Sequence, residues 1–227
     1  MKPDAARERT LLVLGLAALL LYFVGAALPS PPLRLATKAV PVLCLAVWTR
    51  TGPPSTLRRL VASGLFLSAL GDLLLEIGLF LAGLLAFLLA HVVYALAFSS
   101  VTRRPALARA APFALYGALA WLFLRPGLGP LALPVLAYTA AICTMLWRAA
   151  ARVGAPGDDA RAAWLGLAGA LLFAASDSLI ALERFHGPLG GGGQAILPLY
   201  WLGQLGIALS AAPRARAPLV SSPPEDE

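Results

Sequence analysis

Long apolar stretches, separated by short polar segments, follow one another along almost the whole chain. A bilayer core of about 30 Å needs about 20 mainly apolar residues per helix. The stretch from Leu57 to Phe98 would be about 63 Å long as one helix, so it must fold back, with Glu76-Ile77-Gly78 as the predicted tip. We therefore predict an all-α polytopic membrane bundle of about eight transmembrane helices, near residues 11–28, 34–49, 58–77, 79–99, 106–124, 129–147, 162–183 and 195–212.

The composition indicates that the main solvent of this chain is lipid. Hydrophobic residues make up 59% of the 227 residues and charged residues 13%. An ordinary soluble domain is about 45–50% apolar and about 25% charged. This comparison excludes a simple soluble enzyme, a disordered protein and a fibrous rod. We expect residues 1–212 to form a single integral membrane domain.

The distribution of basic residues predicts the orientation of the helices. The formal net charge is +7, and with a cytoplasmic N-terminus fourteen of the 18 lysines and arginines fall in the inner segments. Cytoplasmic loops are enriched in these residues, and an odd number of helices would destroy the bias. Both termini are therefore expected to be cytoplasmic. No nucleic-acid partner is expected, because the basic residues are not clustered with aromatic residues on one element.

The two ends of the chain differ from an ordinary membrane helix: the first segment has features of a signal peptide, and the last segment has those of a disordered tail. The first apolar segment follows a basic N-terminus and ends in Gly25-Ala26-Ala27, so it also resembles a signal peptide. Its length and the spans that follow favour a retained helix. Residues 213–227 are rich in proline and end in acidic residues, so we expect a disordered cytoplasmic tail.

Neither the glycine run nor the cysteines suggest a binding site. The run Gly190–Gly193 lacks a preceding strand and a following Lys-Ser/Thr, so we interpret it as a flexible outer loop rather than a phosphate-binding loop. Cys44 and Cys143 lie in apolar stretches without metal-binding spacing. We expect them to be reduced packing residues.

Two aspartates lie inside predicted membrane helices. Asp72 and Asp177 are each about one turn past the middle of a helix that runs from inside to outside, so we expect them at similar depth. A charge at the bilayer centre costs about 2.5–3.5 kcal/mol on insertion scales, which makes such residues functional candidates. Two neighbouring carboxylates in a low-dielectric bundle cannot both ionise at low cost. We therefore expect one acid and one base at neutral pH.

Two pairs of polar residues are expected near these aspartates. His91 and Tyr94 share one face of the fourth predicted helix, and Tyr200 and Gln204 share one face of the last. Glycines 203 and 206 allow close helix approach there. His91 has an alternative role as a simple interhelical hydrogen-bond partner, and Tyr200 as an aromatic residue of the membrane interface.

The remaining polar candidates have weaker signals. Lys38 precedes Pro41 by one turn, and it either extends towards the membrane surface or holds a carboxylate or a phosphate. Glu76 lies near a helix end, and we interpret it as a solvated interfacial carboxylate. Ser176 is adjacent to Asp177, and adjacent helical residues point apart, so the two do not form a catalytic triad.

Several kinds of site are excluded by what the sequence lacks. A three-histidine zinc site is not available, because one of the two histidines, His186, is expected in an outer loop. No Gly-x-Ser-x-Gly motif occurs, which argues against a nucleophile-elbow lipase. Lys38 is neither deep nor late enough to bind retinal. We expect no metal and no organic cofactor.

Four short motifs together resemble the YhhN-like lysoplasmalogenase family. They are Gly71-Asp72, Ala90-His91 with Tyr94, Ser176-Asp177, and Tyr200 with Gln204. The resemblance covers the whole predicted membrane region. The segments Pro41–Leu45 and Met145–Arg148 are more similar to the vertebrate branch, the transmembrane protein 86 type, than to bacterial members.

The resemblance implies an eight-helix enzyme that hydrolyses the vinyl-ether bond of choline and ethanolamine lysoplasmalogens. The products would be a fatty aldehyde and glycerophosphocholine or glycerophosphoethanolamine. It implies Asp72 and Asp177 as catalytic residues, with the supporting or substrate-orienting residues His91, Tyr94, Ser176, Tyr200, Gln204 and Lys38. The implied partner is a lysophospholipid in the bilayer, with a second copy of the chain as a potential homodimer partner. In a eukaryotic cell the implied membrane is the endoplasmic reticulum.

Three other functions compete with this one. An intramembrane aspartyl protease would require glycine where the chain has Ala69, and its Pro-Ala-Leu motif is misplaced at Pro105-Ala106-Leu107. A transporter or proton-relay protein would use Asp72, Asp177 and His91, but the sequence shows no inverted repeat. A structural or partner-binding membrane protein is the third alternative.

Overall fold

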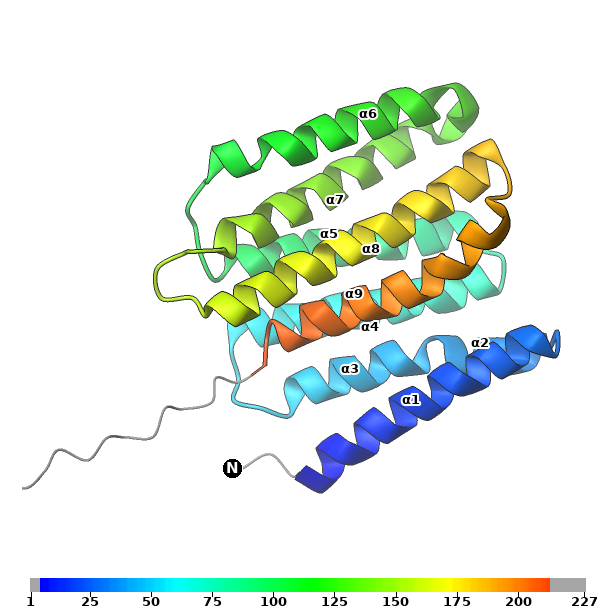
Figure 1. Cartoon of the computed structure of the whole chain (residues 1–227), viewed down its shortest axis with the longest axis horizontal. Helices are drawn as coiled ribbons and strands as arrows, with labels where there is room; N and C mark the ends of the chain where they lie inside the picture. The colour runs from blue at the N-terminus through cyan, green and yellow to red at the C-terminus, as the bar shows by residue number, and fades with distance from the viewer. Residues whose placement is uncertain (1–4, 213–227) are drawn as a thin grey trace, which may run out of the picture.

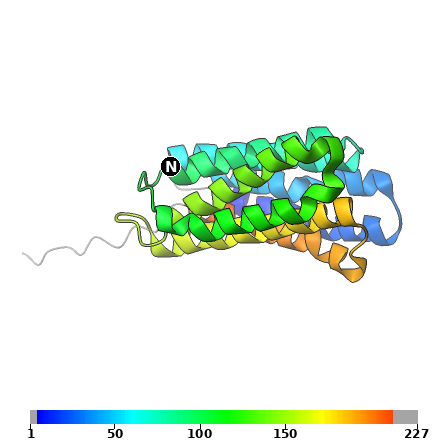
Figure 2. The ribbon, with the colours of Figure 1, turned by 90° about the horizontal axis from the view of Figure 1, so that it is seen from above.

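The computed structural model describes residues 5–212, and every regular element in this range is helical. The long helices lie roughly along one axis (Figures 1 and 2). The α-helices are α1 (Ala5–Ala27), α2 (Pro31–Lys38), α3 (Val40–Arg50), α4 (Thr56–Glu76), α5 (Phe80–Ser99), α6 (Ala111–Leu128), α7 (Ala132–Arg152), α8 (Ala160–His186) and α9 (Ile196–Leu209). Three short 3₁₀ helices are η1 (Leu107–Arg109), η2 (Gly129–Leu131) and η3 (Gly190–Ala195). The predicted tail 213–227 lies outside the described residues.

The connections between helices define two ends of the bundle. Residues 77–79 join α4 to α5 at the end that we call the α4–α5 end, on the right of Figure 1. The α1–α2, α6–α7 and α8–α9 connections lie at this end as well. The opposite end, the α3–α4 end, holds the α3–α4, α5–α6 and α7–α8 connections. Both limits of the described chain also lie there.

Five segments are long and apolar enough to cross a membrane, and two central helices are not among them. The five are Ala6–Ala27, Pro31–Arg50, Phe80–Ser99, Leu107–Arg152 and Ala160–His186. Helix α4 carries four charged residues, and α9 has 14 residues, fewer than the roughly 20 that a bilayer core requires. Helix α4 packs mainly on α5, and α9 packs mainly on α8. The all-helical membrane class is thus confirmed.

The helix boundaries differ from the prediction where proline and glycine act. The predicted helix 34–49 is broken at Ala39, because Pro41 lacks an N–H and its ring crowds the preceding turn. The predicted helix 106–124 starts at Ala111 instead, since Ala106 has a φ of 42° and η1 follows it. The predicted tip at 76–78 is confirmed: α4 ends at Glu76, and Gly78 has a φ of 81°.

Two predictions for the α8–α9 connection are wrong. His186 is the last residue of α8 rather than part of a loop, and its ring stacks on Phe123 with centroids 4.4 Å apart. The glycine run forms η3 rather than an irregular linker. Gly193 packs against the carboxylate of Glu183, where a Cβ atom would lie 2.2 Å from Oε1. This contact holds the run against α8.

Helices α8 and α9 approach so closely that their backbones touch. A Cβ atom on Gly169 would lie 2.6 Å from the backbone nitrogen of Ile207, and one on Gly203 would lie 2.8 Å from that of Phe173. Gly206 faces the same contact, with Gly169 Cα at 2.8 Å. Small residues allow such close packing in membrane bundles. It places Tyr200 and Gln204 of α9 deep in the molecule.

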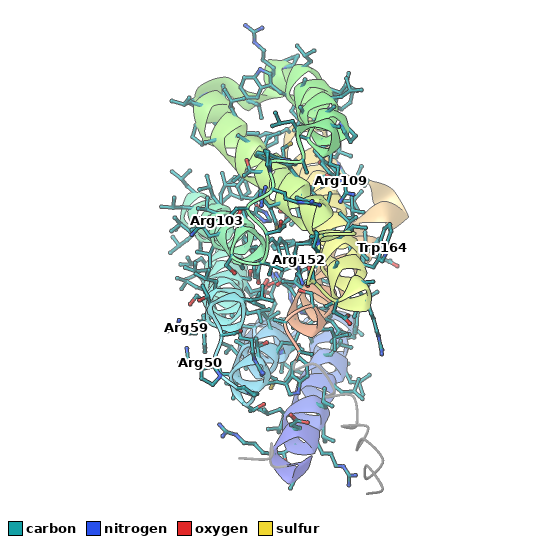
Figure 3. All side chains as sticks on the ribbon, turned by 90° about the vertical axis from the view of Figure 1, so that its left-hand side faces the viewer. Arg50, Arg59, Arg103, Arg109, Arg152 and Trp164 are labelled. Atoms are coloured by element: carbon teal, nitrogen blue, oxygen red, sulfur yellow. The ribbon has the colours of Figure 1, made fainter. Side chains whose placement is uncertain are left out.

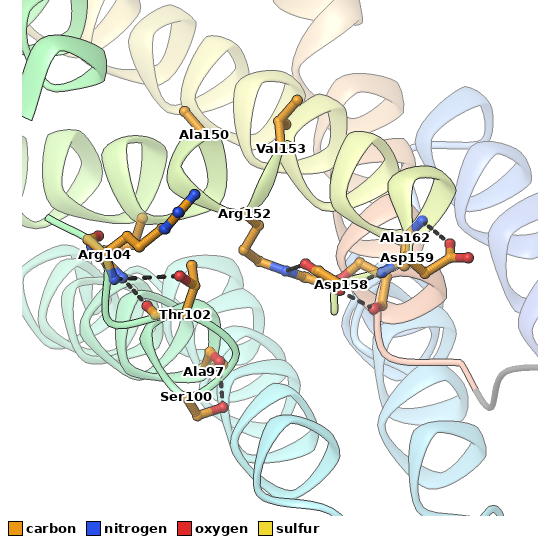
Figure 4. Close-up of polar contacts among 12 residues, drawn as sticks. Ala97, Ser100, Thr102, Arg104, Ala150, Arg152, Val153, Asp158, Asp159 and Ala162 are labelled. Atoms are coloured by element: carbon orange, nitrogen blue, oxygen red, sulfur yellow. Dashed lines mark hydrogen bonds and ion pairs between the residues drawn. The ribbon is translucent and has the colours of Figure 1, made fainter. Parts of the chain in front are cut away.

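Three arginines at the α3–α4 end are buried and bind oxygen atoms of the protein. Arg58 donates to the carbonyl of Thr49 at 2.8 Å, and Arg148 donates to the carbonyls of Thr102 and Arg104. Arg152 binds Asp158 at 2.9 Å (Figure 4). Figure 3 looks onto this end and shows Arg152 in the middle of the bundle. Some of the basic residues that predict orientation therefore also fix the loops in place.

Substituting Gly203 by alanine tests the backbone contact between α8 and α9. We expect Gly203→Ala to lower the free energy of unfolding by about 1–3 kcal/mol, because the new methyl group meets backbone atoms that cannot move aside. Gly15→Ala is the matched control, since its Cβ atom would lie 3.5 Å from the nearest atom, an ordinary contact. The measurement is thermal unfolding of the purified protein in detergent. Equal stability of the two variants would contradict the interpretation.

Candidate functional site

Asp72 is buried in the middle of the bundle with one hydrogen-bond donor. It lies in the second half of α4 and is 2% exposed. The hydroxyl of Tyr200, from α9, donates to Oδ2 of Asp72 at 2.7 Å. Tyr200 is 3% exposed, so the alternative of an aromatic residue at the membrane interface is wrong. The tyrosine instead satisfies a carboxylate that lipid alone would leave without a partner.

Asp177 receives two hydrogen bonds on a single oxygen. Nε2 of His91, from α5, lies 2.7 Å from Oδ2 of Asp177, and the hydroxyl of Tyr138, from α7, donates to the same atom at 2.8 Å. His91 has no exposed surface, and its Nδ1 has no hydrogen-bond partner. Three helices therefore converge on this carboxylate. His91 is the interhelical hydrogen-bond partner that the sequence suggested as one of its two roles.

An aromatic ring connects the hydrogen-bond partners of the two carboxylates. Phe173, one turn before Asp177 on α8, has no exposed surface. Its ring centroid lies 4.5 Å from that of His91 and 5.3 Å from that of Tyr200. The partners of Asp72 and of Asp177 thus touch the same ring, and each carboxylate has its own donors.

Tyr94 and Gln204 form a third buried group. The hydroxyl of Tyr94 donates to Oε1 of Gln204 at 2.7 Å, and neither side chain is exposed. Gly64 makes room for the tyrosine ring, because a Cβ atom there would lie 2.3 Å from it. Nε2 of Gln204 is buried and has no hydrogen-bond partner among the described residues. The group therefore retains capacity for one more polar ligand.

The other candidates lie apart from these groups. Ser176 donates to the carbonyl of Ile196 at 2.9 Å and so fixes the start of α9 rather than contacting Asp177. Lys38 donates to Oε2 of Glu76 at 3.0 Å, so it holds a carboxylate rather than extending alone towards the membrane surface. The interpretation of Glu76 as a solvated carboxylate is wrong, because its side chain is 6% exposed and also pairs with Arg34 at 2.6 Å.

An apolar cavity leads to Asp177 from the α4–α5 end. It has a volume of about 150 Å³ and lies among α5, α6, α7 and α8, with Leu75 of α4 at one side. Asp177 is the one carboxylate in its lining. Tyr138 lines the cavity next to Asp177, and Phe80 and Phe185 line it towards the α4–α5 end. The cavity therefore combines an apolar wall with a hydrogen-bonded carboxylate at its inner end.

Phe87 lies between this cavity and Asp72. Its ring lines the cavity, and its centroid lies 5.8 Å from that of Tyr200, which binds Asp72. Gly71 accommodates the ring, because a Cβ atom there would lie 2.6 Å from it. Asp177 thus faces the cavity directly, and Phe87 links the cavity lining to the tyrosine that holds Asp72.

Carboxylates held in this way suit acid–base chemistry on an apolar molecule. A carboxyl group in a water-poor site can donate a proton, and an ionised one can stabilise a developing cation. Within residues 5–212, no group of three or more His, Cys, Asp or Glu side chains is arranged to hold a metal ion.

Tyr138 is the functional candidate that the sequence did not reveal. It lies in the middle of an apolar helix and is 8% exposed. A buried tyrosine hydroxyl usually has a hydrogen-bond partner, which is the signal that could have identified it. Tyr116 has the same signal, and its hydroxyl lies 2.6 Å from Oγ of Ser178 in the cavity lining.

Comparison with known proteins shows that the chain is similar to several proteins named lysoplasmalogenase. A model of the YhhN family matches residues 33–211, which include every site residue described above. Lysoplasmalogenase TMEM86B of Homo sapiens is 36% identical over 187 residues, which cover 77% of this chain and 73% of the relative. Lysoplasmalogenase TMEM86A of Homo sapiens is 35% identical over 206 residues, which cover 84% and 83%. A lysoplasmalogenase of Mycobacterium tuberculosis is 33% identical over 201 residues, which cover 79% and 73%. No solved structure shows significant similarity to the chain.

Removing the hydroxyl of Tyr200 tests whether it supports the buried carboxylate. We expect Tyr200→Phe to lower the free energy of unfolding by about 1–3 kcal/mol, because Asp72 then lacks a donor. Tyr22→Phe is the matched control: Tyr22 is 7% exposed, and its hydroxyl makes no hydrogen bond to another residue of the described range 5–212. Thermal unfolding in detergent measures both. The interpretation is wrong if the two phenylalanine variants lose the same stability.

Proposed function

The chain belongs to the YhhN family, and from this membership we propose that it is a lysoplasmalogenase. Its reaction would be the hydrolysis of the vinyl-ether bond of 1-alkenyl lysoglycerophospholipids. The products would be a fatty aldehyde and glycerophosphocholine or glycerophosphoethanolamine. The observation that carries the proposal from the structural side is the buried pair of hydrogen-bonded aspartates, one of which faces an apolar cavity.

The chemistry of a vinyl ether matches this pair. Its hydrolysis begins with proton transfer to the β-carbon, which leaves a positively charged oxocarbenium ion. Water then adds to the carbon that carries the oxygen, and the resulting hemiacetal separates into the aldehyde and the free hydroxyl group. We propose that one of Asp72 and Asp177 donates the proton, while the other, ionised, stabilises the cation and activates the water.

The surrounding side chains then act on the carboxylates. His91 and Tyr138 hold Asp177, and Tyr200 holds Asp72, so each carboxylate keeps one orientation. Gln204, held by Tyr94, has a free amide N–H₂ group that would orient water or substrate. Ser176 acts only on the backbone of η3 and α9 in this scheme.

The cavity is proposed to hold the alkenyl chain. Its wall is mostly apolar, and its inner end is Asp177. A chain bound there would bring its first double bond to the carboxylate and exclude bulk water from the oxocarbenium ion. Burial of apolar surface would provide most of the binding free energy.

The membrane arrangement completes the proposal. We propose eight crossings with both termini in the cytoplasm, in which α2 and α3 form one broken span. In a eukaryotic cell the membrane would be the endoplasmic reticulum. A homodimer remains a prediction. The transport alternative is not favoured, because the relatives described above are named lysoplasmalogenase.

Replacing each aspartate by asparagine tests the two-carboxylate mechanism. Purified protein in detergent is given a lysoplasmalogen, its saturated alkyl-ether analogue and its acyl analogue, and aldehyde release is followed. We expect aldehyde from the vinyl ether alone, and a decrease of at least about 100-fold in Asp72→Asn and in Asp177→Asn, since neither amide can exchange the required proton.

Asp159→Asn is the control for this substitution. Asp159 caps α8 by accepting a hydrogen bond from the backbone of Ala162, and asparagine caps helices equally well. Full turnover by a folded Asp72→Asn or Asp177→Asn protein would refute the mechanism. Absence of aldehyde from folded wild-type protein would refute the function.

Filling the cavity tests where the alkenyl chain binds. Ala120 of α6 lines the cavity, whereas Ala118 of the same helix is exposed. We expect Ala120→Phe to lower kcat/KM for an octadecenyl lipid about tenfold relative to a decenyl lipid, because less room remains for a long chain. Ala118→Phe should leave this ratio unchanged. An equal ratio in both variants would place the chain elsewhere.

A further inference from the structure

We propose that Arg34 and Lys38 bind the phosphate group of the lysophospholipid substrate. This inference rests on the proposed function, because it assigns the headgroup site of the same reaction. The two cations come from α2 and meet the single carboxylate of Glu76 on α4. This cluster, which we call the Glu76 cluster, has one more positive charge than negative. A phosphodiester carries the single negative charge that would balance it.

The Glu76 cluster has unused hydrogen-bonding capacity. Within residues 5–212, Nε of Arg34 is buried without a hydrogen-bond partner. Lys38 has three donor positions, and its acceptor among the same residues is Oε2 of Glu76. The side chain of Lys38 is 13% exposed and that of Arg34 39%, so the cluster is open on the arginine side. A phosphate oxygen could therefore reach both cations without displacing the carboxylate.

The position of the cluster suits a lipid headgroup rather than an internal ion pair alone. Glu76 is the last residue of α4, at the α4–α5 end of the bundle. Lys38 is the last residue of α2, at the break before α3. Headgroups of a bilayer lie at the ends of membrane helices, outside the hydrocarbon core.

The spacing between the cluster and Asp72 matches the geometry of the substrate. Glu76 follows Asp72 by four residues on the same face of α4, a rise of about 6 Å. Lys38 donates to Glu76 and is therefore held near this turn of α4. In a lysoplasmalogen only the glycerol carbons separate the vinyl-ether oxygen from the phosphate, a separation of similar size. A phosphate on Arg34 and Lys38 would therefore place the ether group at the depth of Asp72.

The test compares two substrates that differ in the phosphate. Full-length protein in detergent is given a 1-alkenyl lysophospholipid and a 1-alkenylglycerol with the same chain. We expect Arg34→Gln and Lys38→Gln each to lower the ratio of kcat/KM for the phospholipid to that for the alkenylglycerol about tenfold, through KM. Arg125→Gln removes an exposed cation of α6 near the same end and should leave this ratio unchanged.

Glu76→Gln separates the proposal from a purely structural ion pair. If the cations serve the phosphate, this variant keeps or increases the preference for the phospholipid, because the competing carboxylate is gone. If the cations only stabilise the fold, Glu76→Gln loses the preference as Lys38→Gln does. That result would overturn the proposal, as would an unchanged ratio in both cation variants.

A binding measurement keeps the test independent of catalysis. Binding of a non-hydrolysable 1-alkyl lysophospholipid and of 1-alkylglycerol to each protein is measured by calorimetry. Loss of phospholipid binding in the cation variants would support the headgroup site even if wild-type protein released no aldehyde, an outcome that refutes only the enzymatic function. Inorganic phosphate is added as a competitor. If it displaces the lipid at comparable concentration, the site is a general anion site, and the headgroup assignment is wrong.

Discussion

The burial of two carboxylates inside an apolar helical bundle is the constraint on which the rest of the structure depends. A carboxylate in lipid must find donors within the protein, because the bilayer core supplies none. Asp72 finds one in Tyr200, and Asp177 finds two in His91 and Tyr138. These donors come from α9, α5 and α7. The polar pairs therefore determine which helices must be neighbours.

The packing of the helices follows from this requirement. The hydroxyl of Tyr200 reaches Asp72 only because α9 lies deep in the bundle, and α9 lies deep because Gly169 and Gly203 let its backbone touch that of α8. Gly71 likewise lets the ring of Phe87 lie close to α4. At the α3–α4 end, Arg58 of α4 donates to a carbonyl in the last turn of α3, and Arg148 of α7 donates to a carbonyl of the α5–α6 connection. These bonds help to hold the helices in register.

The sequence identified the ionisable residues of the site, but not the side chains from other helices that contact them. Asp72 and Asp177 could be identified because a buried charge is costly, and this cost is evident without knowing which residue donates a hydrogen bond to it. The pairings of Glu76 and Tyr200 could not be predicted, since a sequence shows neighbours along one helix and not the side chains that another helix brings. Tyr138 was missed for the same reason. The break at Ala39 was underestimated, although Pro41 gave its cause.

The contrast between apolar and charged groups, which stabilises the bundle in lipid, also distinguishes the two parts of the proposed substrate. Two cations lie at a helix end and match a phosphate, while an apolar cavity among α5, α6, α7 and α8 matches a hydrocarbon chain. The vinyl ether is the group that joins the polar and apolar halves of such a lipid. In the proposed arrangement it lies at the boundary between them, one turn inside the Glu76 cluster. A carboxylate placed at this boundary can act on the ether bond while the headgroup stays in its ordinary position at the membrane surface.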